Sequence, residues 1–444
     1  MSVKTFSDLN LNASLLNALA DMGLEYPTPI QEQVFAPIMS GRDIIGTAQT
    51  GTGKTLAYLL PVLRLLKYSE ARDPRVLIVV PTRELVIQVV GEIEKLTQYT
   101  STRTTGVYGG TNINTQKLQV MQGQDIVVAT PGRLVDLALH GALKLKTAKT
   151  LIIDEVDEML NLGFRPQLVT LLDLLGEKRQ NLLFSATMTE EVQSLIEDFF
   201  NAPVHIAAAK VSMPAEKIDL YLYRVPNFNT KVNLLIHLLR TEESMRKILI
   251  FTKNKKHADL LHANLPEEFQ EKIGVIHSNK SQNLRIRTVK KFTEGTYRAL
   301  IATDIIARGL DVEGITHVIN FELSEVPENF VHRVGRTARA EAEGTALSFV
   351  TEKEKPYLEK IEDLIVQKIE ERDLPAETQI SEELIPDEVE RKGGDIDYLG
   401  GARNKKKADA FHGKKAKNLK VNRAQEKRRA RKEQKKKARR KKRK

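Results

Sequence analysis

Short runs of Val, Ile and Leu alternate with longer amphipathic stretches along most of the chain. In the first half the apolar runs are "DIIGTA" at 43, "RVLIVV" at 75, "DIVVAT" at 125, "TLIIDE" at 150 and "NLLFSAT" at 181. Strands that are buried on both faces are apolar at successive positions, whereas intervening segments such as "RELVIQVVGEIEKL" are apolar at helical spacing. The pattern predicts parallel strands that alternate with helices.

The same rhythm returns after residue 215. The second set of runs is "KILIFT" at 247, "IGVIHS" at 273, "RALIATD" at 298, "HVINFEL" at 317 and "GTALSFV" at 344. Alternating strands and helices indicate the α/β class, so we expect two successive parallel sheets. The expected organisation is a first domain over 1–205, a linker over 206–215, a second domain over 216–366, an acidic connector over 367–400 and a basic tail over 401–444.

A glycine-bearing string follows the first apolar run. "AQTGTGKT" differs from the phosphate-binding pattern G-x-x-x-x-G-K-[ST] only at Ala48, and it stands between a predicted strand and a predicted helix. Helix starts have unsatisfied N–H groups, Lys54 offers a charge to phosphates, and Thr55 offers a hydroxyl to magnesium. A chance Gly-Lys-Thr loop is the alternative. The predicted nucleotide-binding residues here are Ala48, Gln49, Thr50, Gly51, Thr52, Gly53, Lys54 and Thr55.

Carboxylates stand where the strand "TLIIDEVDEML" ends. A phosphate loop needs a carboxylate to hold Mg²⁺, and we assign that role to Asp154. Glu155 can then take a proton from an attacking water, because phosphoryl transfer depends on orientation and charge neutralisation. The alternative is that Asp154, Glu155 and Asp157 only cap the next helix.

The ordered strings "AQTGTGKT", "PTREL", "TPGR", "DEVD", "SAT", "ARGLD" and "HRVGRTAR" resemble the motifs of the DEAD-box RNA helicases of superfamily 2. The resemblance covers about residues 6 to 365 and implies two tandem RecA-like domains that use ATP and Mg²⁺. Val156 replaces the alanine of D-E-A-D, and Ala338 stands where glycine is common. Neither change removes a charged group.

The resemblance also implies how adenine is bound. "GLEYPTPIQ" is similar to the family's adenine reader, in which Gln31 would satisfy a donor and an acceptor on the edge of the base and select ATP over GTP. Phe6 stands where the family keeps an upstream aromatic residue. The alternative for Phe6 is a hydrophobic staple of a surface helix.

Residues of the second half are implied to complete the ATP site. Arg336 and Arg339 are three residues apart and would share a face if helical. By resemblance they are arginine fingers that stabilise charge on the transferred phosphoryl group. Asp311 is expected near the ribose hydroxyls and His332 near the acidic string. Asp157, Ser185 and Thr187 would link the ATP site to the RNA-facing side, although Ser and Thr at a strand end are also ordinary turn and cap residues.

The remaining motifs are expected to hold a sugar-phosphate chain. Contacts to phosphate position a strand without reading its sequence, and contacts to the 2′-hydroxyl distinguish RNA from DNA, so low sequence specificity follows. Aromatic residues are only 5% of the chain and tryptophan is absent, which favours backbone contacts over base stacking. By resemblance, the helix near "GRLVDLALHG" bends one strand. The candidate RNA contacts are Pro81, Thr82, Arg83, Gly109, Gly110, Thr130, Pro131, Gly132, Arg133, Thr252, Gln282, Arg285, Thr303 and Asp304.

Charge divides the chain into two parts. The net charge is +11, but residues 401–444 hold 23 Lys and Arg against three acidic residues, which leaves −9 for residues 1–400. The tail is therefore predicted to be disordered when free and to anchor RNA without sequence preference, with nuclear targeting or solubilisation as alternatives. The acidic connector has no purpose that its sequence reveals.

The composition limits the setting in which the chain works. Cysteine is absent, which excludes thiol catalysis and cysteine-ligated metal and favours a reducing compartment. No leader-like segment or long apolar run is present, so we expect no membrane partner and a cytoplasmic protein.

These observations lead to an ATP-dependent RNA helicase with RNA-stimulated ATPase activity, which remodels short duplexes when its two domains close. An ATP-gated RNA clamp shares every motif, and a DNA translocase is a third hypothesis. The compact core and single tail are most similar to bacterial members of the RhlE-like type. That resemblance implies partners such as ribosomal precursors or RNA-turnover proteins.

Overall fold

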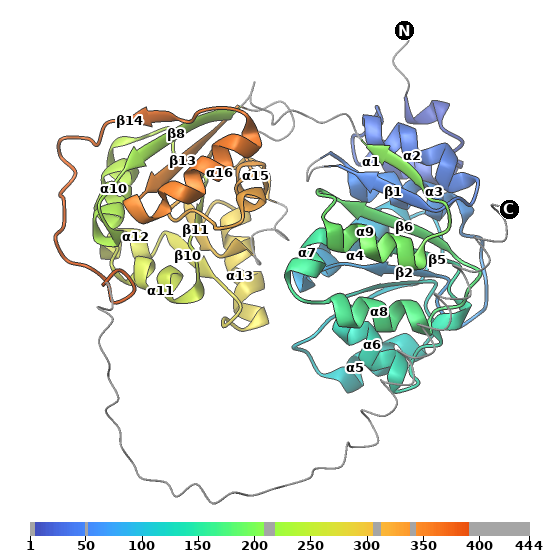
Figure 1. Cartoon of the computed structure of the whole chain (residues 1–444). Coiled ribbons are helices and arrows are strands. Elements are labelled where there is room, and N and C mark those ends of the chain that lie inside the picture. Colours follow the sequence, from blue (N-terminus) through green and yellow to red (C-terminus); the bar gives the residue numbers. More distant parts are fainter. Residues whose placement is uncertain (1–4, 49–51, 208–217, 305–311, 338–342, 390–444) are drawn as a thin grey trace, which may run out of the picture. The chain divides into compact units, whose positions relative to one another are not determined.

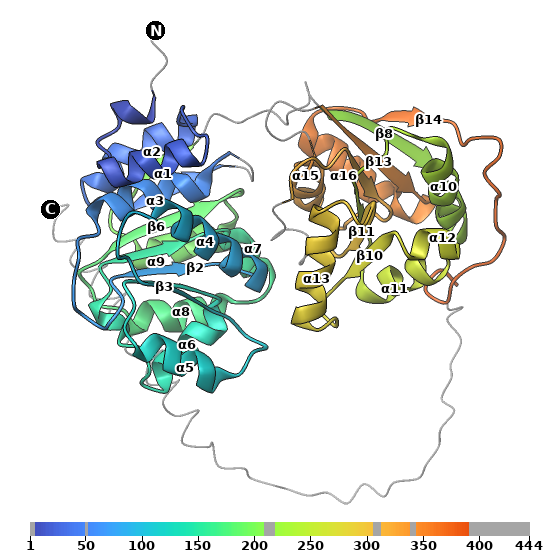
Figure 2. The ribbon, with the colours of Figure 1, turned by 180° about the vertical axis from the view of Figure 1, so that it is seen from behind.

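The computed structural model describes residues 5–48, 52–207, 218–304, 312–337 and 343–389. It contains two seven-stranded sheets, and every strand pair in them is parallel. We call the first sheet with its helices the first lobe (residues 5–207) and the second the second lobe (residues 218–389). Figures 1 and 2 show helices on both sides of each sheet.

The first sheet has the order β3-β4-β2-β5-β6-β1-β7. Its strands are β1 (Ile44–Thr47), β2 (Val76–Val79), β3 (Thr104–Val107), β4 (Ile126–Ala129), β5 (Thr150–Ile153), β6 (Gln180–Ser185) and β7 (Val204–Ala207). Its helices are α1 (Ala13–Asp21), α2 (Pro29–Met39), α3 (Lys54–Leu65), α4 (Arg83–Leu96), α5 (Ile113–Met121), α6 (Pro131–Leu139), α7 (Val156–Asn161), α8 (Arg165–Leu174) and α9 (Glu190–Phe199), with 3₁₀ turns η1 (Phe6–Asp8) and η2 (Leu145–Thr147).

Alternate residues of these strands enter two separate cores. Ile44, Ile78 and Ile152 face helices α1 to α4, whereas Ile45 and Leu77 face helices α5 to α9. Side chains alternate between the faces of a strand, so a strand covered on both faces must be apolar at every position.

The second sheet repeats this plan in the order β10-β11-β9-β12-β13-β8-β14. Its strands are β8 (Ile218–Arg224), β9 (Ile248–Phe251), β10 (Ile273–Ile276), β11 (Ala299–Ala302), β12 (His317–Asn320), β13 (Gly344–Val350) and β14 (Glu370–Arg372). Its helices are α10 (Phe228–Thr241), α11 (Lys255–Ala263), α12 (Glu267–Gln270), α13 (Gln282–Thr293), α15 (Pro327–Val334) and α16 (Lys355–Ile365), with the 3₁₀ turn η3 (Glu352–Glu354). Apolar residues of α13, α15 and α16 cover one face, and those of α10 to α12 cover the other.

The expected pair of parallel α/β sheets is confirmed, and all ten apolar runs form strands. Strands β3, β7, β8 and β14 were not predicted. All four lie at or next to a sheet edge, where a strand can be short and partly polar: β7 buries only Ile206, and β14 is fully exposed.

Two boundaries differ from the expected ones. The first sheet continues through β7 to Ala207, two residues beyond the predicted limit of the first domain, because β7 pairs with β1. The second lobe continues beyond 366, because Glu370–Arg372 pairs with β8 and Ile385 is buried in the core against α10. The described part of the expected connector is thus built into this lobe.

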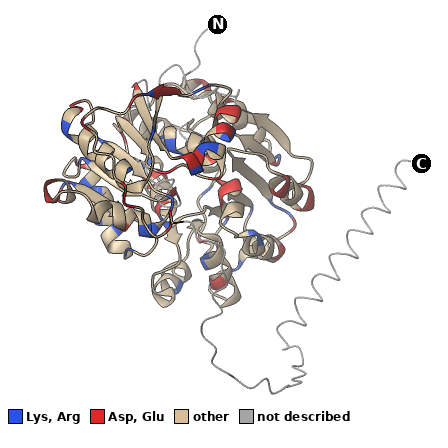
Figure 3. Cartoon of the chain, turned by 60° about the vertical axis from the view of Figure 1, so that its left-hand side comes forward, with Lys and Arg blue, Asp and Glu red and all other residues tan. Residues whose placement is uncertain are grey.

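Within the described ranges, none of the helices combines the length and the apolar character needed to cross a membrane. Figure 3 shows both signs of charge distributed over the helices and strands of the two lobes. Any nucleic-acid contact of the lobes must therefore come from the local placement of charges and backbone donors.

Candidate nucleotide and RNA sites

The phosphate loop leads from β1 into α3, as predicted. Gly53 precedes the helix in a left-handed conformation, with φ of 83°. A Cβ atom at Gly53 would press on the amide of Gln31, which would have to shift, and the positive φ disfavours any residue with a side chain. Gln49, Thr50 and Gly51 lie outside the described residues, and Ala48 is buried.

Lys54 is the first residue of α3, and its side chain is buried, with 6% exposed. Its Nζ makes no hydrogen bond to any residue that the structure describes. A buried ammonium group without hydrogen bonds is unfavourable unless an anion satisfies it. Together with the N–H groups at the start of α3, this charge indicates a site for phosphate.

Asp154 follows β5 and is held in place by two donors. Its Oδ2 accepts a hydrogen bond from the Tyr58 hydroxyl at 3.1 Å, and its Oδ1 accepts one from the Glu155 N–H at 2.9 Å. Burial raises the pKa of Asp154, although the nearby Lys54 lowers it. A buried carboxylate with a raised pKa is one that a bound cation would stabilise.

Glu155 has a strained backbone and a shifted pKa. Its φ is 51°, which is uncommon for a residue with a side chain and typical of functional sites. Burial raises the pKa of Glu155 to about 7, and the neighbouring Asp154 adds to this shift while Lys54 opposes it. A carboxylate that titrates near neutrality is suited to accept a proton.

Asp157 joins the acidic string to the end of β6. Its Oδ2 accepts hydrogen bonds from the Thr187 N–H and hydroxyl, both at 2.9 Å, and from the Ala186 N–H at 3.2 Å. Ser185 is fully buried, and its hydroxyl donates to the Thr187 carbonyl at 2.7 Å. The predicted coupling residues are thus in direct contact, while the coupling itself stays a prediction.

Gln31 lies against the phosphate loop. Its Nε2 donates to the Gly53 carbonyl at 3.1 Å, and its Oε1 accepts from the Thr28 N–H at 2.9 Å. An amide has two N–H donors and two lone pairs, so one of each is left for adenine. Phe6 is 3% exposed and packs in the core with α1 and α2, so its ring has little free face in this structure.

In the second lobe, the described arginines of "HRVGRTAR" have different surroundings. Arg333 is 2% exposed, and its Nε and Nη2 donate to the carboxylate of Asp304 at 2.5 and 2.9 Å. Arg336 is buried, and its Nε donates to the carbonyl of His332 at 3.3 Å. Arg339 and Asp311 lie outside the described residues.

The RNA candidates of the first lobe stand at the carboxyl ends of β2, β3 and β4. Thr82 is buried and caps α4, and its Oγ1 accepts from the Leu85 N–H at 3.3 Å. Gly110 has φ of 80°, and a Cβ atom there would overlap the guanidinium of Arg83, which therefore lies on the glycine backbone. The neighbouring Pro81 is buried and Gly109 is half-buried.

The residues that follow β4 begin helix α6. Thr130 precedes the helix, Pro131 is its first residue, and Gly132 faces open space. Arg133 is buried and donates to the Gln116 side chain at 2.5 Å and to the Thr111 carbonyl at 2.9 Å. Its guanidinium is engaged inside the lobe, which leaves the start of α6 as the candidate RNA contact at this point.

The RNA candidates of the second lobe are largely engaged within the protein. Thr252 is fully buried, and its hydroxyl donates to the Asn254 carbonyl at 3.4 Å. Arg285 is 5% exposed, and its Nη1 donates to the Gln282 side chain at 3.2 Å. Asp304 holds Arg333, as described above, and the neighbouring Thr303 is half-buried. That these segments contact RNA stays a prediction, and several of their polar side chains serve the fold.

Two neighbours of the candidate site residues were missed by sequence reasoning. Tyr58, which holds Asp154, lies four residues after Lys54 in an otherwise apolar helix, and this spacing places both on one face. Arg333 lies in the motif in which Arg336 and Arg339 are the predicted arginine fingers. No local sequence pattern separates a buried arginine that pairs with a carboxylate 29 residues away from one that faces a ligand.

Comparisons with known proteins agree with this geometry. Residues 28–195 match the DEAD/DEAH box helicase family, and residues 230–341 match the helicase conserved C-terminal domain. The DEAD-box ATP-dependent RNA helicase CshA of Bacillus cereus is 39% identical over 373 residues, which are 84% of this chain and 70% of CshA. The chain belongs to the DEAD-box helicases. The RhlE-like type within them stays a prediction.

Solved DEAD-box structures have the same fold. S. cerevisiae Dbp5 bound to RNA and ADP BeF3 is 26% identical, with a TM-score of 0.75 over 84% of this chain and 96% of that one. Mss116p bound to ssRNA and AMP-PNP is 27% identical, with a TM-score of 0.76 over 84% of this chain and 80% of that one. These likenesses confirm the tandem RecA-like architecture of this DEAD-box protein.

Proposed function

We propose that this DEAD-box protein is an ATP-dependent RNA helicase that separates or remodels short RNA duplexes. The observation that carries the proposal is the buried Lys54 ammonium, which makes no hydrogen bond to the described residues and lies in the field of Asp154 and Glu155. This set provides a cation for phosphate, a carboxylate for a metal ion and a base for water. The likeness to structures bound to RNA and nucleotide analogues supports RNA as the second ligand.

The nucleotide would be held by the phosphate loop and Lys54, with adenine against Gln31. Mg²⁺ would be held by Asp154 and Thr55, and it would neutralise phosphate charge. No cluster of three or more acidic or histidine side chains that could hold a metal ion occurs within the described ranges. That fits Mg²⁺, which is commonly bound through one or two carboxylates together with substrate phosphates.

Glu155 would accept the proton of the attacking water. Arg336 and Arg339 would stabilise the negative charge of the transferred phosphoryl group when the lobes close. Neither lobe carries the full set of these groups, so hydrolysis would require both lobes together.

RNA would be held mainly by backbone groups. Helices α4, α6, α11 and α13 each begin just after a strand or the turn that follows it, and their first N–H groups suit phosphate. Such contacts carry no base information, which supports low sequence specificity.

A duplex-separation assay would test this function. With a short labelled RNA duplex we expect ATP-dependent strand release, and we expect a nonhydrolysable analogue to prevent repeated rounds. High RNA affinity with ATP but without strand release would favour the clamp instead. ATPase activity stimulated equally by single-stranded DNA would favour a DNA translocase.

Deleting residues 401–444 is expected to lower RNA affinity and flatten its salt dependence. Each phosphate that the tail neutralises releases counterions, and log K falls by about 0.7 per phosphate for each decade of salt on single strands. Binding of one single-stranded RNA at several salt concentrations measures the slope for the full and the shortened chain. Equal slopes would show that the tail is no RNA anchor.

Ribosomal precursors and RNA-turnover proteins are the partners that the bacterial resemblance suggests. A cytoplasmic location is the corresponding expectation. Crosslinking in cells followed by sequencing of the bound RNA would test the partners, and cell fractionation would test the location.

A further inference from the structure

Residues 373–389 form an extended strap on the second lobe (Figure 1). The strap begins directly after β14, the edge strand of the sheet, and runs along α10. The Asn233 side chain of α10 donates to the Gln379 carbonyl at 2.7 Å, and the Asn229 side chain donates to the Glu383 carbonyl at 2.9 Å. Ile385 is 7% exposed and packs in the core beneath α10 and α11.

Glu388 fastens the end of the strap to the start of α10. Its Oε1 accepts a hydrogen bond from the Phe228 N–H at 2.6 Å, and its Oε2 accepts one from the Ile385 N–H at 3.1 Å. Phe228 is the first residue of α10, where unsatisfied N–H groups favour a carboxylate. The Glu388 carbonyl in turn accepts from Lys353 Nζ at 2.8 Å.

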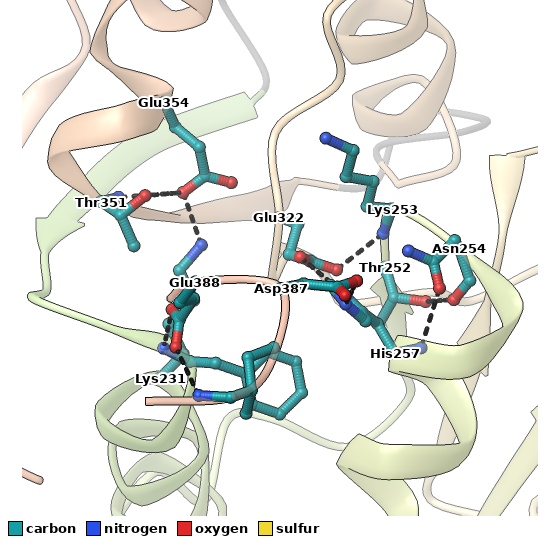
Figure 4. A network of polar contacts seen from close by, with 12 residues as sticks. Lys231, Thr252, Lys253, Asn254, His257, Glu322, Thr351, Glu354, Asp387 and Glu388 are labelled. Atoms are coloured by element: carbon teal, nitrogen blue, oxygen red, sulfur yellow. Dashed lines mark hydrogen bonds and ion pairs between the residues drawn. The ribbon is translucent and has the colours of Figure 1, made fainter. Parts of the chain in front are cut away.

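Asp387 connects the strap to a buried histidine (Figure 4). His257 Nε2 lies 3.0 Å from Asp387 Oδ2, and His257 Nδ1 lies 2.7 Å from Glu322 Oε1. A neutral imidazole donates from only one nitrogen, so both contacts together require the imidazolium form. The side chains of His257 and Glu322 are 9% and 10% exposed, whereas that of Asp387 is 63% exposed.

The same network reaches the loop after β9. Glu322 Oε2 accepts from the Lys253 N–H at 2.8 Å, and the His257 N–H donates to Asn254 Oδ1 at 3.0 Å, which caps α11. The loop 252–254 therefore has its backbone fixed by Glu322 and by the start of α11. It also contains Thr252, one of the expected RNA contacts, and Lys253, whose half-exposed side chain pairs with Glu325 at 3.2 Å.

We propose that the strap is a positioning element for RNA binding, in which Asp387 orients His257 and Glu322 so that the loop 252–254 presents its backbone and Lys253 to the RNA strand. The inference rests on the proposed function, because RNA at this loop is part of it. It gives the first part of the acidic connector a purpose: its carboxylates complete a charge network at the RNA-facing edge. Asp387, His257 and Glu322 are positioning residues, since none of them needs to touch RNA.

The network gives RNA binding a pH dependence. Hydrogen bonding to Glu322 is the main cause that raises the pKa of His257, Asp387 adds to it, and burial opposes both. Burial opposes the charged form of Glu322, but the hydrogen bond from His257, the charge of Lys231 and the N–H of Lys253 stabilise it, and the pKa of that carboxyl is lowered. The contacts of His257 with both Glu322 and Asp387 are thus complete at pH values below the ordinary pKa of histidine. They are lost as the pH rises through the raised pKa of His257.

Asp387→Asn tests the proposal, with Glu383→Gln as the matched control. Both changes remove one negative charge from the exposed surface of the strap. The Glu383 carboxylate makes no hydrogen bond to the residues that the structure describes, and Glu383 is held through its backbone by Asn229 and Ser381. We expect Asp387→Asn to raise the RNA concentration for half-maximal ATPase by about threefold to tenfold, the effect of one charge-assisted hydrogen bond partly screened by solvent. The rate at saturating RNA and the KM for ATP should stay unchanged.

The pH profile separates positioning from general stability. In the unchanged chain the half-maximal RNA concentration should rise as the pH passes through the raised pKa of His257, above the ordinary histidine range. In Asp387→Asn this rise should be smaller, because the Asn amide can donate to the neutral imidazole. If Asp387→Asn needed the same RNA concentration for half-maximal ATPase as the unchanged chain and Glu383→Gln at every pH, the proposal would be overturned.

Hydrogen exchange decides the structural step independently of activity. In the full-length chain, Asp387→Asn should speed exchange of the Lys253 amide more than that of amides in β13. If the unchanged chain shows no RNA-stimulated ATPase, the proposed function fails, yet this measurement still reports whether the strap fixes the loop. Unaltered Lys253 exchange would refute the strap's positioning role.

Discussion

Glu155→Gln is expected to lower RNA-stimulated ATP turnover by about 10²-fold to 10⁴-fold, the usual contribution of a positioned base. Glutamine keeps the shape of the side chain but cannot accept the proton of the attacking water. Binding of ATP should persist, because Lys54 and the start of α3 are unchanged. The substituted chain should therefore accumulate as a complex with ATP and RNA, which a filter-binding assay with both ligands would detect alongside steady-state turnover.

The pH profile of the unchanged enzyme should identify the same group. Burial raises the pKa of Glu155 to about 7, so the carboxyl is protonated and inactive as a base below that value. We expect kcat/KM for ATP to fall tenfold for each pH unit well below about 7 and to level off above it, because this ratio reports groups of the free enzyme. In Glu155→Gln this step should disappear.

Glu190→Gln is the matched control for this pair of measurements. Glu190 is exposed in the first turn of α9, and Glu190→Gln removes the same charge from the same lobe as Glu155→Gln. Its turnover and pH profile should equal those of the unchanged chain. Normal turnover in Glu155→Gln would show that another group takes the proton.

The central strands could be predicted because their burial is local in sequence. Runs such as "RVLIVV" are apolar at every position, since both faces of β2 are covered. β14 could not be found in this way: its three residues are charged and exposed, and only pairing with β8 about 150 positions earlier makes them a strand. The strap has the same character, because two buried residues, Thr378 and Ile385, and hydrogen bonds to α10, His257 and Lys353 hold it.

The same distinction between local sequence and tertiary packing applies to the candidate site. Lys54, Asp154 and Glu155 could be assigned because phosphate chemistry demands these groups at the end of a strand or the start of a helix. The function of an arginine could not be assigned from its motif, since Arg133 and Arg333 are both buried in internal hydrogen bonds. A charged side chain that is satisfied inside a lobe and one that faces a ligand have the same sequence pattern, and only tertiary packing separates them.

Arg336→Ala is expected to reduce ATP turnover by about 10³-fold to 10⁵-fold, the typical effect of an arginine finger. The guanidinium would stabilise charge that develops on the phosphoryl group during transfer, so its loss should affect turnover far more than ATP binding. Arg336 is buried at the end of "HRVGR", and its Nε bonds to the carbonyl of His332, which holds the side chain near the helix end. Steady-state ATPase with saturating RNA, together with fluorescence binding of a labelled ATP analogue, measures both quantities.

Two further variants make this result specific. Arg246→Ala removes an exposed arginine from the same lobe and should leave turnover unchanged. Arg336→Lys keeps the charge but loses the planar fork of donors, so it should recover only a small part of the lost rate. If Arg336→Ala weakened ATP binding as strongly as it lowered turnover, the arginine would act on the ground state, and the requirement for two lobes in hydrolysis would lose its main chemical basis. If Arg336→Ala kept full turnover, the finger role would pass to another cation of the second lobe, with Arg339 as the first candidate to replace.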